Sequence, residues 1–149
     1  MKRRWEIPQG LRVFPDGSWR VGDLHVIHPP SLRYLKSRLV HEESGDYIVE
    51  GEQRMAVEVR GPAFHAVSLV LEPGDEEARV VLDDGSVERI DDHDLGMNRD
   101  TGRFECRVRG GDFAALLARG PHQSLIEHVE EEGGRFYLRV GRRRIAVRT

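Results

Sequence analysis

One pattern occurs twice in this chain, and it restricts the fold more than any other feature. Residues 41–59, HEESGDYIVEGEQRMAVEV, predict the end of a helix, a turn and a two-stranded hairpin, and residues 130–149, EEEGGRFYLRVGRRRIAVRT, repeat the pattern. The matching residues are Gly45 with Gly134, Tyr47 with Phe136, Gly51 with Gly141, Arg54 with Arg144, Ala56 with Ala146 and Val57 with Val147, with one residue inserted between the first two matches and the other four. We therefore expect a fold organised around two copies of a helix-plus-hairpin unit.

The length of 149 residues is enough for one compact domain or for two small subdomains that share a core. The 38% hydrophobic and 33% charged residues are typical of a globular protein, and they exclude the disordered and membrane classes. Gly61-Pro62 separates the two halves of the pattern. We predict an N-terminal α+β subdomain at residues 1–61 and a C-terminal α+β subdomain at residues 62–149.

In the first half, residues 11–21 predict two short strands joined at Asp16-Gly17. Pro29-Pro30 then favours the start of a helix. The apolar face of this helix is formed, at helical spacing, by Leu32, Leu35, Leu39 and Val40. Ser44-Gly45 is expected to end the helix before the first hairpin.

In the second half, we predict a central strand at residues 64–71, a strand paired with it at 78–82 and a short strand at 87–90. A polar surface loop at 91–102 and a half-buried strand at 104–108 follow. Asp112 is then expected to cap a helix that carries Phe113, Leu116 and Leu117. A further helix follows over residues 125–129. With about nine or ten strands and three helices, the fold class is α+β.

Three observations bear on the location of the protein. No apolar run approaches the roughly 20 residues that span a bilayer. The start MKRRWEIPQG has no apolar segment after its basic residues, so it does not resemble a secretory signal. The lone Cys106 cannot form an internal disulfide, which fits a reducing compartment. We expect a cytoplasmic protein without a membrane span.

The formal net charge of −3 argues against a dedicated nucleic-acid-binding protein. The positive charge is nevertheless uneven, because arginines crowd the final hairpin at Arg139, Arg142, Arg143, Arg144 and Arg148. Nucleic-acid binding by this hairpin stays open as an alternative, and it would show a steep salt dependence.

No group of residues has the spacing of an established metal site. The acidic loop at residues 91–94 offers carboxylate and imidazole ligands, but an EF-hand needs alternate acidic positions, a glycine and a distal glutamate. His25 and His28 lack a second pair of ligands, and surface positions account for His122 and His128. We expect no metal and no cofactor; a metal-dependent enzyme that uses residues 91–94 is an alternative.

Motifs of nucleophilic catalysis and of phosphate loops, GxSxG and GxxxxGK, are absent from the sequence. Cys106 lies at an inward-facing strand position, where a buried thiol is the usual outcome. Arg107 points to the other face of the strand and should not activate this thiol. We therefore expect a protein without enzymatic activity.

The arginines form the clearest candidate site. Arg107 and Arg109 share one strand face, and Arg119 lies near the end of the following helix. Since an arginine fork binds phosphate or carboxylate oxygens bidentately, these side chains are candidate anion contacts, with Trp19 or Tyr47 available to stack on a base. Two alternatives stay open: the arginines balance acidic runs in surface ion pairs, and Trp19 is a core residue.

Several short motifs follow one another in a distinctive order. They are Asp16-Gly17-Ser18-Trp19, the leucine-spaced helix, Gly45-Asp46-Tyr47, Val57-Glu58-Val59 leading to Pro62 and Phe64, and CRVRGGDFAALLARG from Cys106 to Gly120. In this order the chain resembles the bacterial family known as domain of unknown function 1285 (DUF1285). The resemblance implies a two-part α+β fold with a duplicated motif and a C-terminal part superficially similar to a pleckstrin-homology domain. It also implies a ligand-binding or signalling module with a nucleotide-type ligand between the two parts.

These observations predict a binding module whose site lies in the cleft between the two halves. The expected partner is a nucleotide-like or phosphorylated small molecule. The alternative is a protein-interaction module, in which a hairpin edge or the pleckstrin-like surface binds a protein partner. The two hairpin turns read GEQR and GRRR, and we expect the functional difference between the halves at this position.

Overall fold

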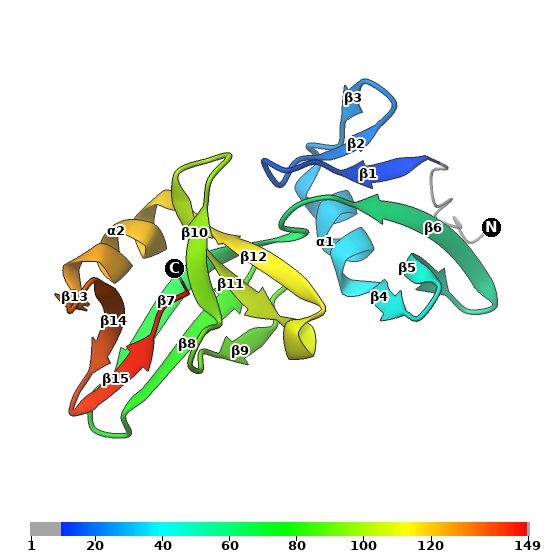
Figure 1. Cartoon of the computed structure of the whole chain (residues 1–149). Helices are drawn as coiled ribbons and strands as arrows, with labels where there is room; N and C mark the ends of the chain where they lie inside the picture. Colours follow the sequence, from blue (N-terminus) through cyan, green and yellow to red (C-terminus); the bar gives the residue numbers. More distant parts are fainter. Residues whose placement is uncertain (1–9, 149) are drawn as a thin grey trace.

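The computed structural model describes residues 10–148, and these form fifteen β-strands, two α-helices and one short 3-10 helix. Figure 1 shows two lobes, the N-terminal half (residues 10–61) and the C-terminal half (residues 62–148). The fold is a mixed one of helices and sheets, as predicted, but it has more strands and fewer helices than expected. The basic start of the chain (residues 1–9) lies outside the described residues. Within residues 10–148, no helix is long and apolar enough to cross a membrane.

The N-terminal half contains a six-stranded sheet in the order β3-β2-β1-β6-β5-β4. Strands β1 and β6 are parallel, and the other neighbours are antiparallel. The strands are β1 Leu11–Val13, β2 Trp19–Val21, β3 Leu24–His25, β4 Leu39–Glu42, β5 Gly45–Glu50 and β6 Gln53–Val59. Helix α1 (Pro29–Ser37) precedes β4, and its two prolines suit the first turn because the N–H groups there have no partner within the helix.

The C-terminal half contains a six-stranded sheet, in the order β10-β11-β12-β7-β8-β9, and the three-stranded sheet β13-β14-β15. The strands are β7 Phe64–Glu72, β8 Glu77–Leu82, β9 Val87–Arg89, β10 Leu95–Asn98, β11 Arg103–Val108, β12 Phe113–Leu117, β13 Val129–Glu132, β14 Arg135–Val140 and β15 Arg143–Ala146. A 3-10 turn, η1 (Arg109–Gly111), separates β11 from β12. Helix α2 (Arg119–Glu127) joins β12 to β13 and packs against β7, β11 and β12.

Helix α1 with β4–β6, and helix α2 with β13–β15, have the same element order and are named the first and second helix–strand units. Their pairing registers agree. Leu39 pairs with Ile48 in the first unit as Val129 pairs with Leu138 in the second. The helix ends also agree, because the N–H of Arg38 donates to Leu35 O and the N–H of His128 donates to Leu125 O.

These registers correct the alignment predicted from the sequence. Tyr47 pairs with Ala56, and it is Tyr137, not Phe136, that pairs with Ala146. The offset between the two units is therefore the same throughout, and no residue is inserted. A one-residue shift would turn every side chain of the strand to the opposite face, so the glycine match of Gly45 with Gly134 does not reflect equivalent positions.

The end of the first helix differs from the prediction. Helix α1 ends at Ser37, and Leu39 and Val40 belong to β4, so that each unit has three strands rather than a two-stranded hairpin. Their apolar side chains satisfied a helical spacing by chance, because Leu39 is buried in the sheet while Val40 is partly exposed on the other face.

A predicted helix and a predicted loop are also strands. The run FAALL forms β12, whose N–H and C=O groups pair with β11 on one side and β7 on the other. A short continuous apolar run fits a strand buried on both faces as well as it fits a helix, and here the pairing with two strands decides. Residues 95–98, within the predicted polar loop, form β10 with Leu95 buried.

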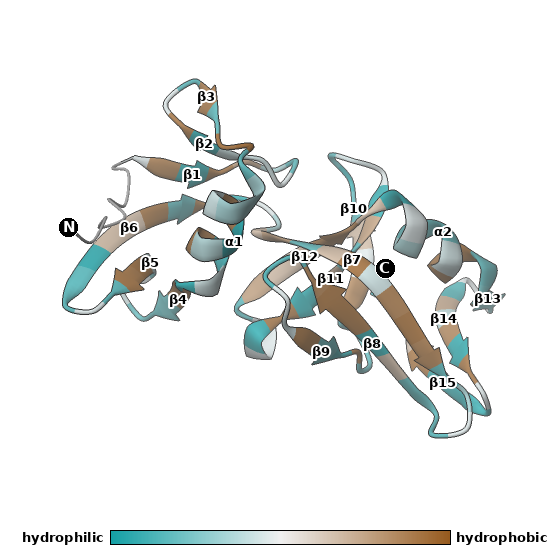
Figure 2. Ribbon diagram, turned by 180° about the vertical axis from the view of Figure 1, so that it is seen from behind, coloured by the Kyte–Doolittle hydropathy of each residue, from teal (hydrophilic) through white to brown (hydrophobic). Residues whose placement is uncertain are grey.

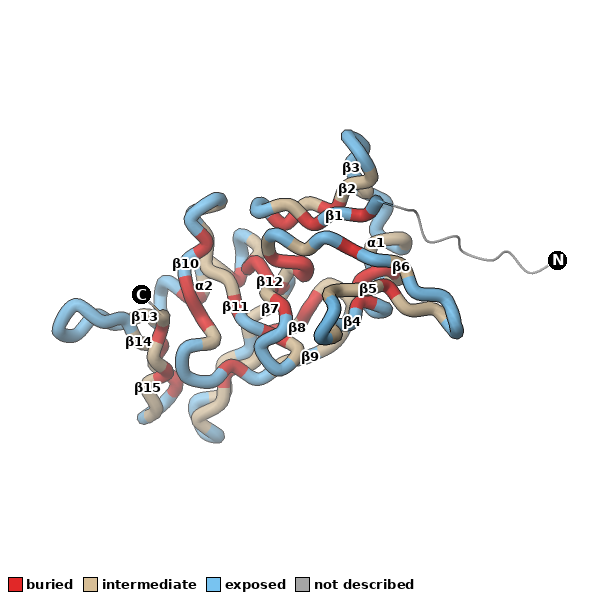
Figure 3. Tube along the Cα trace, turned by 45° about the vertical axis from the view of Figure 1, so that its right-hand side comes forward, coloured by how far each residue is buried: buried red, intermediate tan, exposed pale blue. Residues whose placement is uncertain are grey.

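The predicted strands at residues 64–71, 78–82 and 104–108 are confirmed as β7, β8 and β11. Figure 2 shows the apolar residues concentrated along β7, β8 and β12, and Figure 3 shows buried positions in both lobes. In β8 the buried positions alternate at Ala78, Val80 and Leu82, the pattern of a strand with one face in the core.

We expect Gly141→Ala to destabilise the protein more than Gly51→Ala, although the two glycines are equivalent in the two units. Both have a left-handed φ, +61° and +57°, which costs an L-residue about 1–2 kcal/mol. A Cβ at Gly51 meets no atom within 4 Å, whereas a Cβ at Gly141 overlaps the carbonyl oxygen of Pro73. Urea unfolding should give a loss of about 1 kcal/mol at Gly51 and at least about 2 kcal/mol at Gly141. Equal losses would show that the contact with Pro73 carries no cost.

Candidate functional site

The three predicted arginines have different environments. The guanidinium of Arg109 donates to Asp84, lies 3.6 Å from Glu88 and is stacked over the ring of Phe64. Arg107 on β11 and Arg119 at the start of α2 are exposed, and within residues 10–148 neither pairs with a carboxylate. Arg109 is therefore already neutralised, while the other two carry free surface charge.

The two predicted stacking residues do not present free rings in the same place. Trp19 is buried in the N-terminal half, and its indole N–H donates to Ala63 O at 2.8 Å. Tyr47 on β5 is half-buried, its hydroxyl shares a hydrogen bond with Ser44 Oγ, and Arg54 lies over its ring. The hydrogen bond from Trp19 reaches the segment just after Gly61-Pro62, so this side chain helps to join the two halves.

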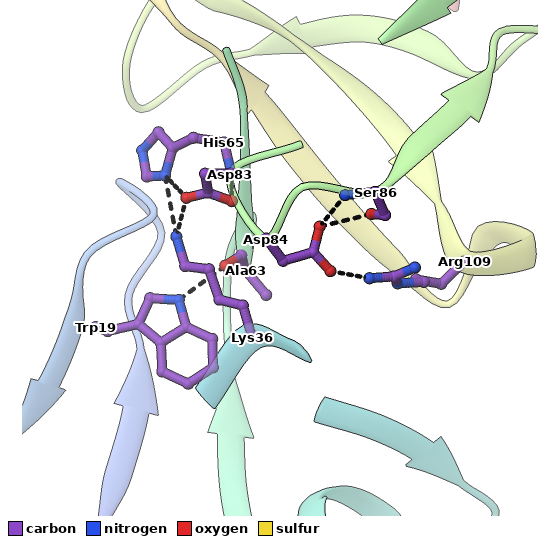
Figure 4. Close-up of polar contacts among 8 residues, drawn as sticks. All are labelled: Trp19, Lys36, Ala63, His65, Asp83, Asp84, Ser86 and Arg109. Carbon is purple, nitrogen blue, oxygen red and sulfur yellow. Dashed lines mark hydrogen bonds and ion pairs between the residues drawn. The ribbon is translucent and has the colours of Figure 1, made fainter. Parts of the chain in front are cut away.

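A polar network fills the contact between the halves (Figure 4). Lys36 of α1 is only 2% exposed, and its ammonium group pairs with the carboxylate of Asp83, which follows β8. Asp83 also accepts a hydrogen bond from the backbone N–H of His65, and the His65 ring lies 3.4 Å from Lys36 Nζ. Nearby, Arg33 of α1 lies against Gly85. Each buried charge in this contact has a partner within the chain.

The titration of Asp83 reflects this environment. Burial alone would raise the pKa of Asp83, but the hydrogen bonds from His65 and the charge of Lys36 outweigh it, so the pKa lies below the ordinary value of 3.8. The carboxylate is therefore ionised at neutral pH and satisfies the buried ammonium group. Lys36, His65 and Asp83 were not among the residues predicted from the sequence, since no local pattern distinguishes a lysine that will be buried from one at the surface.

A second candidate site is a cavity of about 630 Å³ in the C-terminal half, between α2, the β10–β11 hairpin and the sheet of the second unit. Its volume lies in the range of small-molecule sites. Its apolar lining is formed by Met97, Phe104, Ile126, Val129, Phe136 and Val147. Met97, Ile126 and Phe136 remain between 41% and 47% exposed. Exposed apolar side chains gathered in one cavity indicate a surface that a partner molecule can cover.

Arg148 lies at this cavity with Arg99. The Nε of Arg148 donates to His93 O at 2.7 Å, and its Nη2 donates to Asp94 O at 3.2 Å. In the described part of the chain it pairs with no carboxylate, in contrast to Arg139, Arg143 and Arg144 of the same sheet. Arg148 is thus a fixed guanidinium whose positive charge is not neutralised by a carboxylate of residues 10–148.

His122 adds a polar group to the cavity wall. Its Nδ1 accepts a hydrogen bond from the N–H of Phe104 at 3.1 Å, and the two rings lie 5.5 Å apart. Burial and the nearby charge of Arg103 lower the pKa of His122. The ring is therefore neutral at pH 7 and carries its proton on Nε2, because Nδ1 acts as an acceptor.

The cavity was not predicted from the sequence. Its β10 wall comes from the segment expected to be a polar loop, where the alternation of Leu95 and Met97 was the only available signal. Arg148 was counted among the crowded arginines of the final hairpin. Arg148 differs from the paired arginines because it lies beside β10, and the sequence pattern does not predict this position.

The other candidate chemistries can also be located. Asp91 pairs with Arg89 and Arg143, and Asp92 accepts a hydrogen bond from the N–H of Ala146. Within residues 10–148, no three His, Cys, Asp or Glu side chains are grouped to hold a metal ion. Burial raises the pKa of the Cys106 thiol to about 12, so this thiol is not a nucleophile at neutral pH.

Comparison with known proteins identifies the fold. No family model and no curated protein matches the chain. Among solved structures, the chain is similar to a DUF1285 family protein from Silicibacter pomeroyi DSS-3, with a TM-score of 0.72 and 20% identity over 93% of this chain and 79% of that one. It is also similar to a DUF1285 family protein from Shewanella baltica OS155, with a TM-score of 0.60 and 12% identity over 80% of this chain and 91% of that one. The resemblance to DUF1285 predicted from the sequence is therefore confirmed at the level of the fold.

Proposed function

We propose that this chain is a binding module for a small organic anion with an apolar body, and that the ligand occupies the cavity beside α2. One observation carries the proposal: Arg148 is fixed at an apolar cavity without a carboxylate partner in the described residues. Apolar contact supplies most of the affinity in such a site, and a few polar groups fix the orientation of the ligand. The excess positive charge of Arg148 and Arg99 favours an anion.

A nucleotide-like ligand between the two halves, the form predicted from the sequence, is supported less well. Lys36 and Arg109 in that region each pair with a carboxylate of the chain. An anion entering there would have to displace Asp83 or Asp84, and breaking a buried ion pair is costly. In the cavity of the C-terminal half, an anion can bind Arg148 without displacing a carboxylate of residues 10–148.

We propose that the module has a signalling or carrier role in the cytoplasm, without a catalytic step. The cytoplasmic location is supported by the lone buried Cys106, which fits a reducing compartment. We also propose that the two helix–strand units arose by duplication, since their registers agree at every paired position. A superficial similarity of the C-terminal half to a pleckstrin-homology domain is proposed on the packing of α2 against its sheet.

We expect Ile126→Glu to weaken binding of the anionic dye 8-anilinonaphthalene-1-sulfonate by at least about tenfold, or about 1.4 kcal/mol. The new carboxylate repels the sulfonate and replaces part of the apolar lining of the cavity. The measurement is a fluorescence titration at pH 7, with thermal unfolding to show that the variant remains folded. The side chain is 46% exposed, so the fold should tolerate the change.

The matched control is Val87→Glu, at a 57% exposed position on β9 that does not line the cavity. This variant should bind the dye as the parent protein does. If the parent does not bind the dye, or if Ile126→Glu binds it unchanged, the cavity is not a site for an apolar anion.

A protein-interaction module is the second candidate, and one observation favours it. Leu24 and Ile27, on and beside β3, are 76% and 78% exposed, and Figure 3 shows this end of the N-terminal half as exposed. Two exposed apolar side chains on and just after an edge strand suit a protein contact. In this case Leu24→Ser with Ile27→Ser should abolish partner capture, while Ile126→Glu should leave it unchanged.

A further inference from the structure

The free donors of Arg148 indicate which anion the cavity takes. A guanidinium has five N–H donors. Two are used by His93 O and Asp94 O, through Nε and Nη2. Within residues 10–148 this leaves both N–H groups of Nη1 and one of Nη2 without an acceptor, and these form the end of the guanidinium. Two parallel N–H groups at this end match the two oxygens of one carboxylate.

Gly96 of β10 lies against the guanidinium of Arg148. A Cβ at Gly96 would lie 2.8 Å from Cζ, 2.9 Å from Nη2 and 3.1 Å from Nη1 of Arg148. The guanidinium therefore lies flat against the backbone of β10. Gly96 does not have a left-handed φ, so the position requires glycine for space rather than for conformation. Any side chain here would push the guanidinium out of its present position.

The first helix–strand unit provides an internal comparison. By the common register, Lys36 is equivalent to Ile126 and Glu58 to Arg148. In the first unit the helix face at Lys36 is closed by Asp83, a carboxylate of the same chain (Figure 4). In the second unit the equivalent helix position, Ile126, is apolar and exposed, and the cation at the cavity is Arg148 on the strand side. One unit thus binds a carboxylate of its own chain, and the other leaves both its apolar surface and its cation open.

We propose that the ligand is a monocarboxylate with an aliphatic or aromatic body, and that the end of the Arg148 guanidinium binds its carboxylate. This inference rests on the proposed function and specifies its ligand class. The apolar body lies along Met97, Ile126 and Phe136, which become covered. A dianionic phosphate fits less well, because only one fork is held in place and the lining is mainly apolar.

The inference is tested by calorimetric titration of the parent protein with decanoate, decan-1-ol and decyl phosphate. Decanoate should bind at least about tenfold more tightly than the alcohol and more tightly than decyl phosphate. Arg148→Lys keeps the positive charge but loses the two parallel N–H groups of the guanidinium. Gly96→Ala keeps the charge and the guanidinium but displaces the guanidinium from its position. Each variant should weaken decanoate binding about tenfold and leave decan-1-ol binding unchanged. Arg107→Lys, at an exposed arginine on β11, is the control and should bind all three as the parent does.

The outcomes separate the inference from the function on which it rests. If none of the three compounds binds the parent, the proposed function and the inference both fail. If the alcohol binds as tightly as decanoate, the cavity remains a binding site but the carboxylate assignment is overturned. Tighter binding of decyl phosphate overturns the ligand class in the same way. Since these comparisons use the parent protein, they stand even if Arg148→Lys fails to fold, and Gly96→Ala supplies a second variant.

Discussion

Replacing Asp83 with alanine is expected to lower the free energy of unfolding by about 3–5 kcal/mol. The change removes the carboxylate that pairs with Lys36, and Lys36 is 2% exposed. An ammonium group left without a partner at this depth must lose its proton or draw in water, and both cost free energy. Urea unfolding at pH 7, followed by circular dichroism, measures the loss.

The control for this prediction is Glu58→Ala. Glu58 pairs with Arg12 and Arg60 on the surface, where the three side chains are 41%, 59% and 71% exposed. Such pairs contribute about 0–1 kcal/mol. If Asp83→Ala and Glu58→Ala cost the same, the network between the halves does not stabilise the fold. Combining Asp83→Ala with Lys36→Met should recover part of the loss, because the buried charge is then absent.

The same pair predicts a dependence on pH. The pKa of Asp83 is lowered in the folded protein, from an ordinary value of 3.8. Its contribution to stability is therefore complete above pH 3.8 and is lost as the pH falls through the lower, folded value. The difference in unfolding free energy between the parent and Asp83→Ala should be constant from pH 5 to 7 and should shrink below about pH 3.8.

Trp19→Ala is expected to cost about 3–5 kcal/mol, the second large effect. The side chain is 2% exposed, and its indole N–H donates to Ala63 O at 2.8 Å. Truncation leaves a cavity in the N-terminal core and removes a hydrogen bond between the halves. Trp19→Phe keeps most of the apolar volume and should cost less, about 1–3 kcal/mol. Unfolding in urea again gives the values.

This prediction also tests the role that the sequence suggested for Trp19. If the ring only packs in the core, Trp19→Phe should leave the affinity for the anionic dye unchanged, since Trp19 does not line the cavity. A variant that folds with little loss of stability but binds the dye less well would restore Trp19 as a stacking residue.

Strands with a clear alternation or a long β-branched run could be predicted from the sequence. The run FHAVSLVL forms β7, and the alternation at residues 104–108 forms β11. The run FAALL could not be assigned, because its length and composition suit a buried strand and a short helix equally. Its pairing with both β7 and β11 decided the matter, and this pairing depends on residues far away in the sequence.

The sequence by itself determined that two similar segments exist and that strands dominate both, and it predicted arginines as the contacts of an anion site. Only the tertiary structure decided which arginines meet a carboxylate among residues 10–148. Arg109, Arg139, Arg143 and Arg144 meet carboxylates, while Arg148 meets two carbonyl oxygens and Gly96. The reason is physical: a guanidinium acquires or lacks a counter-ion according to what the fold brings within about 4 Å. For Arg109, Arg143 and Arg148 the deciding neighbours are distant in sequence.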